Sequence, residues 1–279
     1  MPKTWSAGRF KLTPSPHSPL IMGIVNVTPD SFSDGGQHHT ANAAMAHAER
    51  LLEEGADILD LGGESTRPGS QGVSVEEEWA RLAPVLQALV GLNVPLSVDT
   101  LKPEIMRRAV DLGVDILNDV NGFRAPGAEQ TLAASNAGGV VMHMLGEPRT
   151  MQVAPQYTDV VSEVTAFLQD RLSALQQQGV DPHRLLVDPG FGFGKTLAHN
   201  VSLMQATAAL SALGAGVLIG VSRKRMIGEI TGVDRPQDRI HGSIAAALFA
   251  AREGAAVVRV HDVKATRDAL LVQAALLAS

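Results

Sequence analysis

Short apolar segments recur along this chain, and most of them follow a glycine that closes a helical pattern. EEGADILDLG and DLGVDILNDV repeat this arrangement with nearly the same residues. Glycine is favoured just past the last turn of a helix because it adopts a positive φ without a Cβ penalty. With LIMGIVN at 20–26 and VPLSVDT at 94–100, the chain contains eight strand-like segments. It is therefore expected to alternate strands with helices.

Helical periodicity fills the stretches between these segments. In 158–178 the apolar residues fall on one face and Gly179 ends the pattern, while in 102–112 Pro103 suits the first helical position. Eight strand–helix alternations in 279 residues predict an α/β protein with a single-domain (β/α)8 TIM barrel. On pattern alone, an open doubly wound sheet is the alternative.

The chain shows no linker or low-complexity stretch that would divide it. We assign residues 1–19 to an N-terminal extension and residues 20–279 to the catalytic barrel domain. The first residues contain charges and prolines but no apolar core of the kind that a signal peptide needs. The apolar runs fall short of the roughly 20 residues that cross a bilayer. We expect a cytoplasmic protein that does not bind membranes.

Composition excludes several functions. The net charge of -6 disfavours binding to nucleic acid or to an anionic membrane, although residues 223–225 form a small basic cluster. The chain has no cysteine, so disulfides, thiol catalysis and thiolate metal sites are excluded. Four histidines lack ligand-like partners at metal spacing and are interpreted as surface residues. They are His17, His38, His39 and His47.

The stretch VDPGFGFGKT at 187–196 approaches two nucleotide-binding signatures and matches neither. A phosphate-binding loop has four residues between its glycines, whereas Gly190 and Gly194 are separated by three. The dinucleotide fingerprint needs a wider final gap between glycines. In a barrel, this stretch would turn sharply after a strand that ends at Asp188 and bring backbone close to a flat ligand. We expect the loop to position the Asp188 carboxylate rather than to bind a phosphate.

Polar side chains close every strand-like segment. They are Asn26, Asp60, Asp99, Asn118, His143, Asp188, Ser222 with Lys224, and Arg259 with His261. The C-terminal ends of barrel strands converge on one face, and active sites of this fold lie there. Any one of these residues could belong to an ordinary loop, but the whole set predicts a site.

These residues divide into two chemical sets. The first offers carboxylates, an amide and an ammonium group to a heterocycle edge that presents N–H donors beside a carbonyl. It comprises Asp99, Asn118, Asp188 and Lys224. The second suits an anion such as a diphosphate, and it comprises Asn26, Arg67, Arg259 and His261. Asn26 also offers a hard oxygen to Mg²⁺.

Seven motifs run in order through nearly the whole chain at barrel spacing. They are MGIVNVTPDSFSDGG (22–36), DLGGESTRPG (60–69), SVDT (97–100), NDV (118–120), DPGFGFGKT (188–196), GVSRK (220–224) and RVHDV (259–263). Together they closely resemble the dihydropteroate synthases, a pterin-binding family of folate biosynthesis. The resemblance implies a transferase that condenses 6-hydroxymethyl-7,8-dihydropterin diphosphate with p-aminobenzoate. The products would be 7,8-dihydropteroate and diphosphate.

The resemblance also implies a role for each site residue. The pterin would be held by Asp99, Asn118, Met142, Asp188 and Lys224. The diphosphate would be bound by Asn26, Arg67, Arg259 and His261, with Asn26 as a ligand of the Mg²⁺ cofactor. The p-aminobenzoate side would be framed by Thr66, Arg67, Pro68, Phe193 and Ser222. The loops NVTPDSFSDGG and GGESTRPGS would close over it, and catalysis would rest on Arg259, His261, Lys224 and Asp99.

This set of residues fits the implied chemistry. An arylamine is already neutral at pH 7, so its positioning matters more than a general base. Mg²⁺, Arg259 and His261 would neutralise the leaving diphosphate, while Asp99 and Asp188 favour a pterin that develops positive charge. We therefore expect a dissociative displacement at the pterin methylene. Sulfonamides should compete as mimics of p-aminobenzoate.

Some residues leave alternatives open. Leu145 and Arg225 depart from the family pattern, but neither is one of the residues inferred to bind a substrate or Mg²⁺. Asp60 is either part of the site or a structural support of the GGESTRPG loop. Lys195 either caps backbone carbonyls or faces the substrate.

Two other functional classes share features with this sequence. A folate-dependent methyltransferase on the same barrel would not need the anion residues Arg67, Arg259 and His261. A non-catalytic pterin-binding homologue would lack ligands that are present here. The resemblance further suggests a homodimer. Its candidate surfaces are HGSIAAALFAARE and ALLVQAALLAS, unless these segments pack on the barrel.

Overall fold

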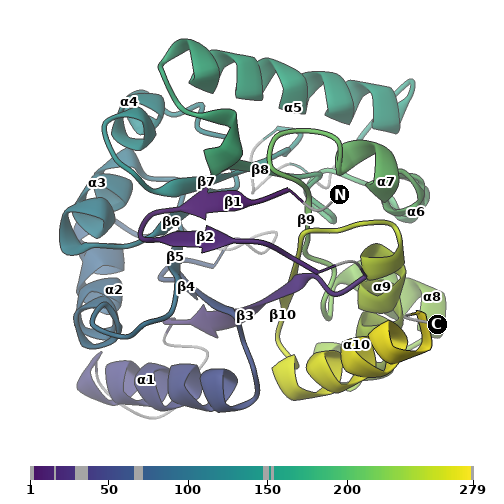
Figure 1. Ribbon diagram of the computed structural model, residues 1–279, viewed down its shortest axis with the longest axis horizontal. Helices are drawn as coiled ribbons and strands as arrows, with labels where there is room; N and C mark the ends of the chain where they lie inside the picture. Colours follow the sequence, from purple (N-terminus) through teal and green to yellow (C-terminus); the bar gives the residue numbers. More distant parts are fainter. Residues whose placement is uncertain are drawn as a thin grey trace.

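The computed structural model describes residues 3–15, 17–28, 37–65, 72–146, 151 and 154–277, with the backbone alone at 37–40. Eight parallel strands form its central barrel, and helices surround it (Figure 1). The strands are β3 (Leu20–Asn26), β4 (Ile58–Gly62), β5 (Leu96–Asp99), β6 (Ile116–Asp119), β7 (Gly138–Met142), β8 (Leu185–Asp188), β9 (Leu218–Ile219) and β10 (Val257–Val260). Each strand lies in one of the predicted segments, and the (β/α)8 fold is confirmed.

The sheet closes on itself almost completely. Hydrogen-bonded neighbours follow the order β8-β7-β6-β5-β4-β3-β10-β9. Between β8 and β9, Val187 and Val217 form a parallel bridge, and the Val187 amide donates to the Gly216 carbonyl at 3.0 Å. An open doubly wound sheet has two unpaired edges, so the bridge excludes that alternative.

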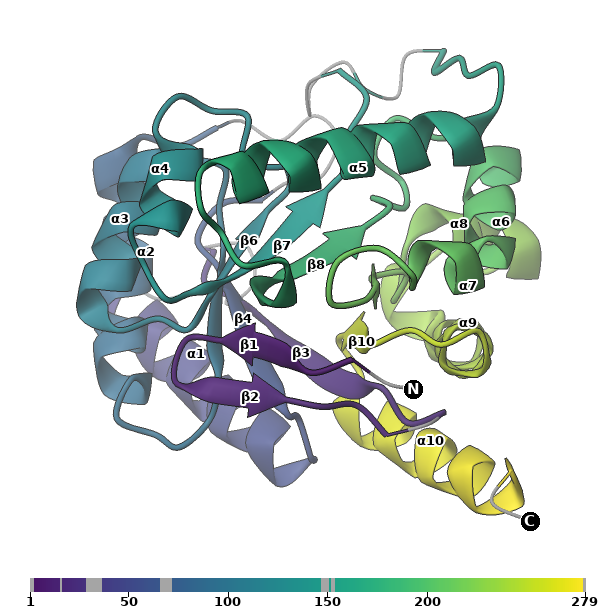
Figure 2. The ribbon, with the colours of Figure 1, turned by 45° about the horizontal axis from the view of Figure 1, so that its top comes forward.

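Helices cover the outside of the barrel (Figure 2). They are α1 (Gln37–Glu53), α2 (Val75–Leu89), α3 (Pro103–Leu112), α4 (Ala128–Ala133), α5 (Val160–Gln177), α6 (Leu197–Gln205), α7 (Thr207–Leu210), α8 (Arg225–Thr231), α9 (Ile240–Arg252) and α10 (Val263–Leu277). Both helices predicted above are present. Asp159 caps α5 by accepting from two backbone amides, and α3 begins at Pro103. Short 3₁₀ turns lie at Pro182–Arg184 and Pro236–Asp238. Among the described helices, none has the length and apolar character needed to cross a membrane.

The N-terminal extension forms a hairpin that covers the end of the barrel where the strands begin. Its strands are β1 (Trp5–Ala7) and β2 (Phe10–Leu12), and Figures 1 and 2 show them lying across the barrel. Trp5 is 1% exposed and packs against apolar side chains from the barrel strands. Arg9 pairs with the buried Asp115 carboxylate at 2.9 Å, just before β6. The hairpin thus seals one end of the barrel and leaves the other for ligands.

We predict that Trp5→Ala lowers the free energy of unfolding by about 3–5 kcal/mol, because it leaves a cavity under the barrel floor. Trp5→Phe keeps an aromatic ring and loses the hydrogen bond from the indole Nε1 to the Arg184 carbonyl, which spans 2.9 Å. It should cost less than half as much. Urea unfolding would measure both values. Equal losses in the two variants would contradict a packing role for the indole ring.

Candidate active site

Alternation along the strands places polar side chains above an apolar layer inside the barrel. Every second side chain of a strand points to the same face. Ile116 and Leu186 belong to the buried cluster around Trp5. Two residues further along the same strands are Asn118 and Asp188, at the C-terminal mouth. The polar residues of the mouth therefore lie directly above a dry floor.

Arg259, on β10, binds two carboxylates at the centre of the mouth. Its Nε donates to Asp60 Oδ2 at 2.6 Å, and its Nη2 donates to Asp99 Oδ2 at 2.9 Å. The Asn118 amide donates to the same Asp60 oxygen at 3.2 Å. Arg259 therefore joins the acidic and cationic sets, which the sequence suggested as separate pockets. Asp60, whose role was open, is fully buried and belongs to this network.

The two carboxylates bound by Arg259 each keep one buried oxygen without a hydrogen-bond partner in the described part of the chain. These atoms are Asp60 Oδ1 and Asp99 Oδ1. Buried polar atoms are usually paired in folded proteins, so an unpaired oxygen in a mouth marks a position for donors that arrive with a ligand. A heterocycle with N–H groups along one edge could supply such donors.

Burial controls the ionisation of the mouth carboxylates. It raises the pKa of Asp99 to about 7, against the opposing charge of Arg259 and with a contribution from Asp60. Burial also raises the pKa of Asp188, while Lys224 and the Gly190 amide act against the shift. The mouth thus holds carboxyl groups whose proton affinity is increased, and a ligand that brings donors or positive charge would favour their ionised forms.

Lys224 immediately precedes α8 and reaches into the mouth. Its Nζ donates to the Phe191 carbonyl at 2.7 Å and lies 4.9 Å from the centroid of the Phe193 ring. Burial lowers the pKa of Lys224 to about 8, and the charge of Asp188 opposes the shift. The group stays mainly protonated at neutral pH, so it can donate to a ligand oxygen or ring nitrogen.

The loop after β8 is fastened to the Asp188 carboxylate, which accepts from the Gly190 amide at 2.7 Å. Gly190 has a φ of 69°, and a Cβ there would lie 1.8 Å from the His143 carbonyl oxygen. Glycine is therefore required at this turn. Lys195 donates to the carbonyls of Gly190 and Phe193 at 2.9 and 3.0 Å and is 4% exposed. Of its two candidate roles, the geometry fits capping of backbone carbonyls.

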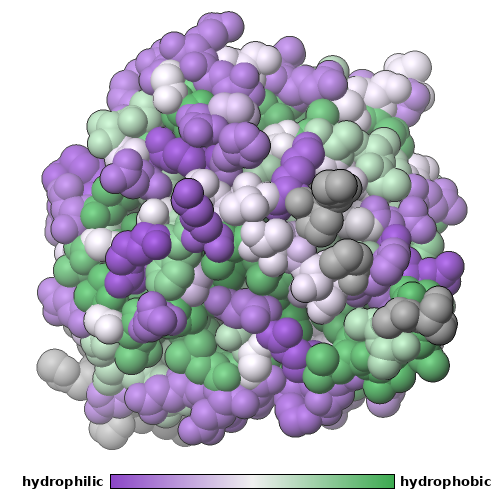
Figure 3. All heavy atoms as spheres, in the orientation of Figure 1, coloured by the Kyte–Doolittle hydropathy of each residue, from purple (hydrophilic) through white to green (hydrophobic). Residues whose placement is uncertain are grey.

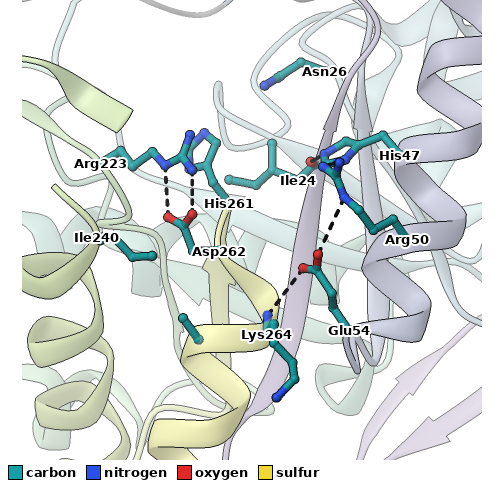
Figure 4. A pocket seen from close by; sticks show the side chains of 11 residues that line it. Ile24, Asn26, His47, Arg50, Glu54, Arg223, Ile240, His261, Asp262 and Lys264 are labelled. Carbon is teal, nitrogen blue, oxygen red and sulfur yellow. Dashed lines mark hydrogen bonds and ion pairs between the residues drawn. The ribbon is translucent and has the colours of Figure 1, made fainter. Parts of the chain in front are cut away.

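A cavity of about 460 Å³ opens beside the mouth, next to β3, α1 and the start of α10 (Figure 4). Asn26 and His261 line it together with Arg50, Arg223 and Lys264. The His261 Nδ1 lies 3.1 Å from the Ser222 hydroxyl, which orients the ring. The cavity also contains the carboxylates Glu54 and Asp262, which pair with some of these cations. A chamber whose walls carry several cations together with Asn26 and His261 suits an anion.

The structure describes only some of the residues that are predicted to bind p-aminobenzoate. Thr66, Arg67 and Pro68 lie outside the described residues, as do large parts of the loops NVTPDSFSDGG and GGESTRPGS. Phe193 packs against a small apolar cluster of Val120, Met142, Met144 and Met151, in which Met142 is 3% exposed. Phe193 and Lys224 are thus brought together, whereas Ser222 lies on the His261 side.

The histidines outside the strand ends differ from one another. His47 was expected at the surface, but it is half-buried against β3, with its Nδ1 2.7 Å from Nη2 of Arg50. Burial, with a contribution from Arg50, lowers the pKa of His47. His17 is exposed, and the side chains of His38 and His39 lie outside the described part. Within the described residues, no group of three His, Cys, Asp or Glu side chains could hold a metal ion.

Sequence reasoning missed an ion cluster beside the mouth. Lys102 binds Glu64 and also donates to Glu78 Oε2 at 2.5 Å. The Glu78 side chain is fully buried. The three residues come from separate segments, and the one available signal was the position of Glu64 in the GGESTRPG motif. The spacing of residues in the sequence did not indicate that Lys102 and Glu78 lie beside Glu64.

Comparison with known proteins places this chain among pterin-binding enzymes. Residues 22–261 match the family model described as "Pterin binding enzyme". The chain is 53% identical over 278 residues to the dihydropteroate synthase of Neisseria meningitidis serogroup B, covering 98% of this chain and 97% of the relative. It is also similar to a solved dihydropteroate synthase from Xanthomonas albilineans with 4-aminobenzoic acid, with 52% identity, a TM-score of 0.93 and full coverage of both chains. A Xanthomonas albilineans structure in complex with 7,8-dihydropteroate matches with 49% identity, a TM-score of 0.88 and 99% coverage of each chain.

The raised pKa of Asp99 predicts a specific pH dependence of stability. The native carboxyl holds its proton up to a pH of about 7, whereas the unfolded carboxyl loses it near its ordinary value of 3.8. Stability contributed by this group is therefore lost as pH rises through that window. Relative to Asp99→Asn, the wild-type free energy of unfolding should fall between about pH 4 and about pH 7. A difference between the two proteins that stays constant with pH would contradict the assignment.

Proposed function

The chain belongs to the dihydropteroate synthase family of pterin-binding enzymes, and we propose that its barrel mouth performs the reaction of that family. Its substrates would be 6-hydroxymethyl-7,8-dihydropterin diphosphate and p-aminobenzoate, and its products 7,8-dihydropteroate and diphosphate. One observation carries the proposal for this chain. A buried network, whose Asp60 and Asp99 each keep one oxygen without a partner among the described residues, adjoins a cavity lined by Asn26, His261 and several cations.

The pterin fits the acidic side of the mouth. Asp99 and Asp188 would accept hydrogen bonds from pterin N–H groups, Asn118 would offer its amide, and Lys224 would donate to the ring carbonyl. Asp60 adds a further unpaired oxygen to the same network. Met142, at 3% exposure, would supply an apolar surface for the flat ring.

The diphosphate fits the cavity beside the mouth. His261, held by the Ser222 hydroxyl, and Arg259 would bind its oxygens, with Arg67 as a further candidate. Arg259 is already bonded to two carboxylates, and the cavity cations Arg50, Arg223 and Lys264 are each paired with a carboxylate. His261 therefore carries most of the case for this subsite.

We infer that Mg²⁺ acts with the diphosphate. Mg²⁺ usually retains several waters and binds one or two protein oxygens together with substrate phosphates. The amide oxygen of Asn26 on the cavity wall fits this coordination preference. Among the described residues, no group of three His, Cys, Asp or Glu side chains could hold a metal ion without the substrate. Asn26 and the substrate would hold the ion, which would supply positive charge to the leaving group.

The residues of the mouth favour a displacement in which the bond to diphosphate breaks early. The carbon–oxygen bond to diphosphate breaks, and the pterin methylene then bonds to the amino nitrogen of p-aminobenzoate, which loses one proton. Asp99 and Asp188 would stabilise a pterin that carries positive charge, and His261 would stabilise the departing anion. A small nucleophile added in excess should trap the pterin methylene if this order holds.

The p-aminobenzoate side would lie near Phe193, whose ring covers Lys224. Thr66, Arg67, Pro68 and Ser222 stay predictions for this subsite. Sulfonamides carry the same aniline group and should therefore compete with p-aminobenzoate. A folate-dependent methyltransferase would bind a pterin in the same network, but it would leave the cation-rich cavity unexplained.

The test of this function is diphosphate release from the pterin diphosphate, with and without p-aminobenzoate. Wild type should release diphosphate in a p-aminobenzoate-dependent reaction, and Lys224→Ala should reduce the rate by at least about tenfold through loss of a buried donor. Lys11→Ala, an exposed lysine on β2 at the opposite end of the barrel, serves as the control and should retain activity close to wild type. A folded wild type that binds pterin without releasing diphosphate would indicate a non-catalytic homologue.

The Mg²⁺ assignment predicts a selective effect of Asn26→Ala. The variant should need about tenfold more Mg²⁺ for half-maximal rate, since it loses one oxygen ligand. Its affinity for 7,8-dihydropteroate should stay unchanged, because that product has no diphosphate. Magnesium titrations of the rate and calorimetric titrations of the product would measure both. Equal loss of product affinity would show that Asn26 acts on the pterin instead.

We also propose a homodimer and a cytoplasmic location. Exposed apolar side chains gather on α10, where Leu271, Val272 and Leu276 are 57%, 61% and 72% exposed (Figure 3). A patch of this kind favours burial against a second copy. Light scattering should give twice the chain mass of 29.3 kDa for wild type, and Val272→Glu should shift it towards monomer. Leu92→Glu, remote from this helix, should leave the mass unchanged, and a monomeric wild type would contradict the proposal.

A further inference from the structure

Lys195 is a buried cation whose described contacts are all with neutral protein groups. It is 4% exposed, and its Nζ contacts the Gly190 carbonyl at 2.9 Å, the Phe193 carbonyl at 3.0 Å and His143 Nδ1 at 2.9 Å. Three acceptors match the three N–H donors of an ammonium group. The side chain therefore has no donor left for a substrate.

The electrostatics of this contact agree with a neutral His143. Burial, followed by the charge of Lys195, lowers the pKa of His143 to about 3. Its Nδ1 is then an acceptor, with the proton on Nε2. Burial lowers the pKa of Lys195 itself to about 7, and Asp188 opposes that shift. Both shifts are consistent with a dry position behind the loop.

The contacts of Lys195 run across the loop that carries Phe193. The side chain returns from residue 195 to carbonyls at 190 and 193, and the Phe193 amide also donates to the Gly190 carbonyl at 3.1 Å. His143, after β7, ties the same ammonium group to the barrel wall. The backbone of Phe193 is thus held from two sides.

The ring of Phe193 projects from this loop towards Lys224 and the mouth. The ring packs against the apolar cluster that contains Met142, and its centroid lies 4.9 Å from Nζ of Lys224. We propose that Lys195 is a positioning residue that fixes the Phe193 ring at the p-aminobenzoate side of the mouth without touching either substrate. This inference rests on the proposed function. It assigns to Lys195 a selective effect on the second substrate.

Steady-state kinetics of Lys195→Met test the proposal. The KM for p-aminobenzoate should rise about tenfold, which corresponds to about 1.4 kcal/mol, while the KM for the pterin diphosphate stays within about twofold. Arg184→Met is the matched control. Arg184 also caps backbone carbonyls, those of Leu132 and Ala137, but it does so at the opposite end of the barrel. This variant should lose stability without changing the ratio of the two KM values.

A double-variant cycle then tests whether Lys195 acts through Phe193. In a Phe193→Ala background, Lys195→Met should produce no further rise in the KM for p-aminobenzoate. If Lys195→Met does not fold, Lys195→Gln should give a smaller change of the same kind, since an amide can donate to two carbonyls. Equal changes in both KM values, or additive effects in the cycle, would overturn the proposal. A wild type without p-aminobenzoate-dependent release would instead contradict the proposed function.

Discussion

The pair of hydrogen bonds from Arg259 to Asp60 and Asp99 is the interaction on which the mouth of this barrel depends. It joins side chains from β10, β4 and β5, and Asn118 of β6 bonds to the same Asp60 oxygen. One guanidinium is shared by two buried carboxylates, and each carboxylate keeps one oxygen that has no hydrogen-bond partner among the described residues. Stability and ligand binding are therefore linked in one place, because breaking such a pair leaves a buried charge without a partner.

The other parts of the site are arranged around this network. The hairpin and the apolar floor exclude water from below, which strengthens the electrostatic interactions above them. Two lysines organise the loop after β8, with Lys195 behind it and Lys224 on the mouth side. The cavity with His261 and Asn26 lies on the other side, at the end of β3 and β10. Arg259 therefore lies between the side where the bond to diphosphate would break and the carboxyl groups that would bind the pterin ring.

Much of this architecture could be predicted from local patterns. Glycines after helices marked the strand starts, and the two-residue period of a strand explains why Asn118 and Asp188 share the mouth. Contacts between distant segments could not be predicted. The pairing of Arg259 with Asp60, and of Lys102 with Glu78, depends on side-chain reach across strands, which no spacing in the sequence records. His47 was misjudged for the same reason, because burial against β3 is a tertiary effect.

The most direct measurement is the binding of two ligands to Arg259→Met, inorganic diphosphate with Mg²⁺ and 7,8-dihydropteroate, each by calorimetry. If Arg259 organises Asp60 and Asp99 as well as facing the anion, both affinities should fall by about tenfold or more. Dihydropteroate has no diphosphate, so its loss would report the disturbed carboxylates. A folded variant that loses diphosphate affinity and binds dihydropteroate as wild type does would contradict the account.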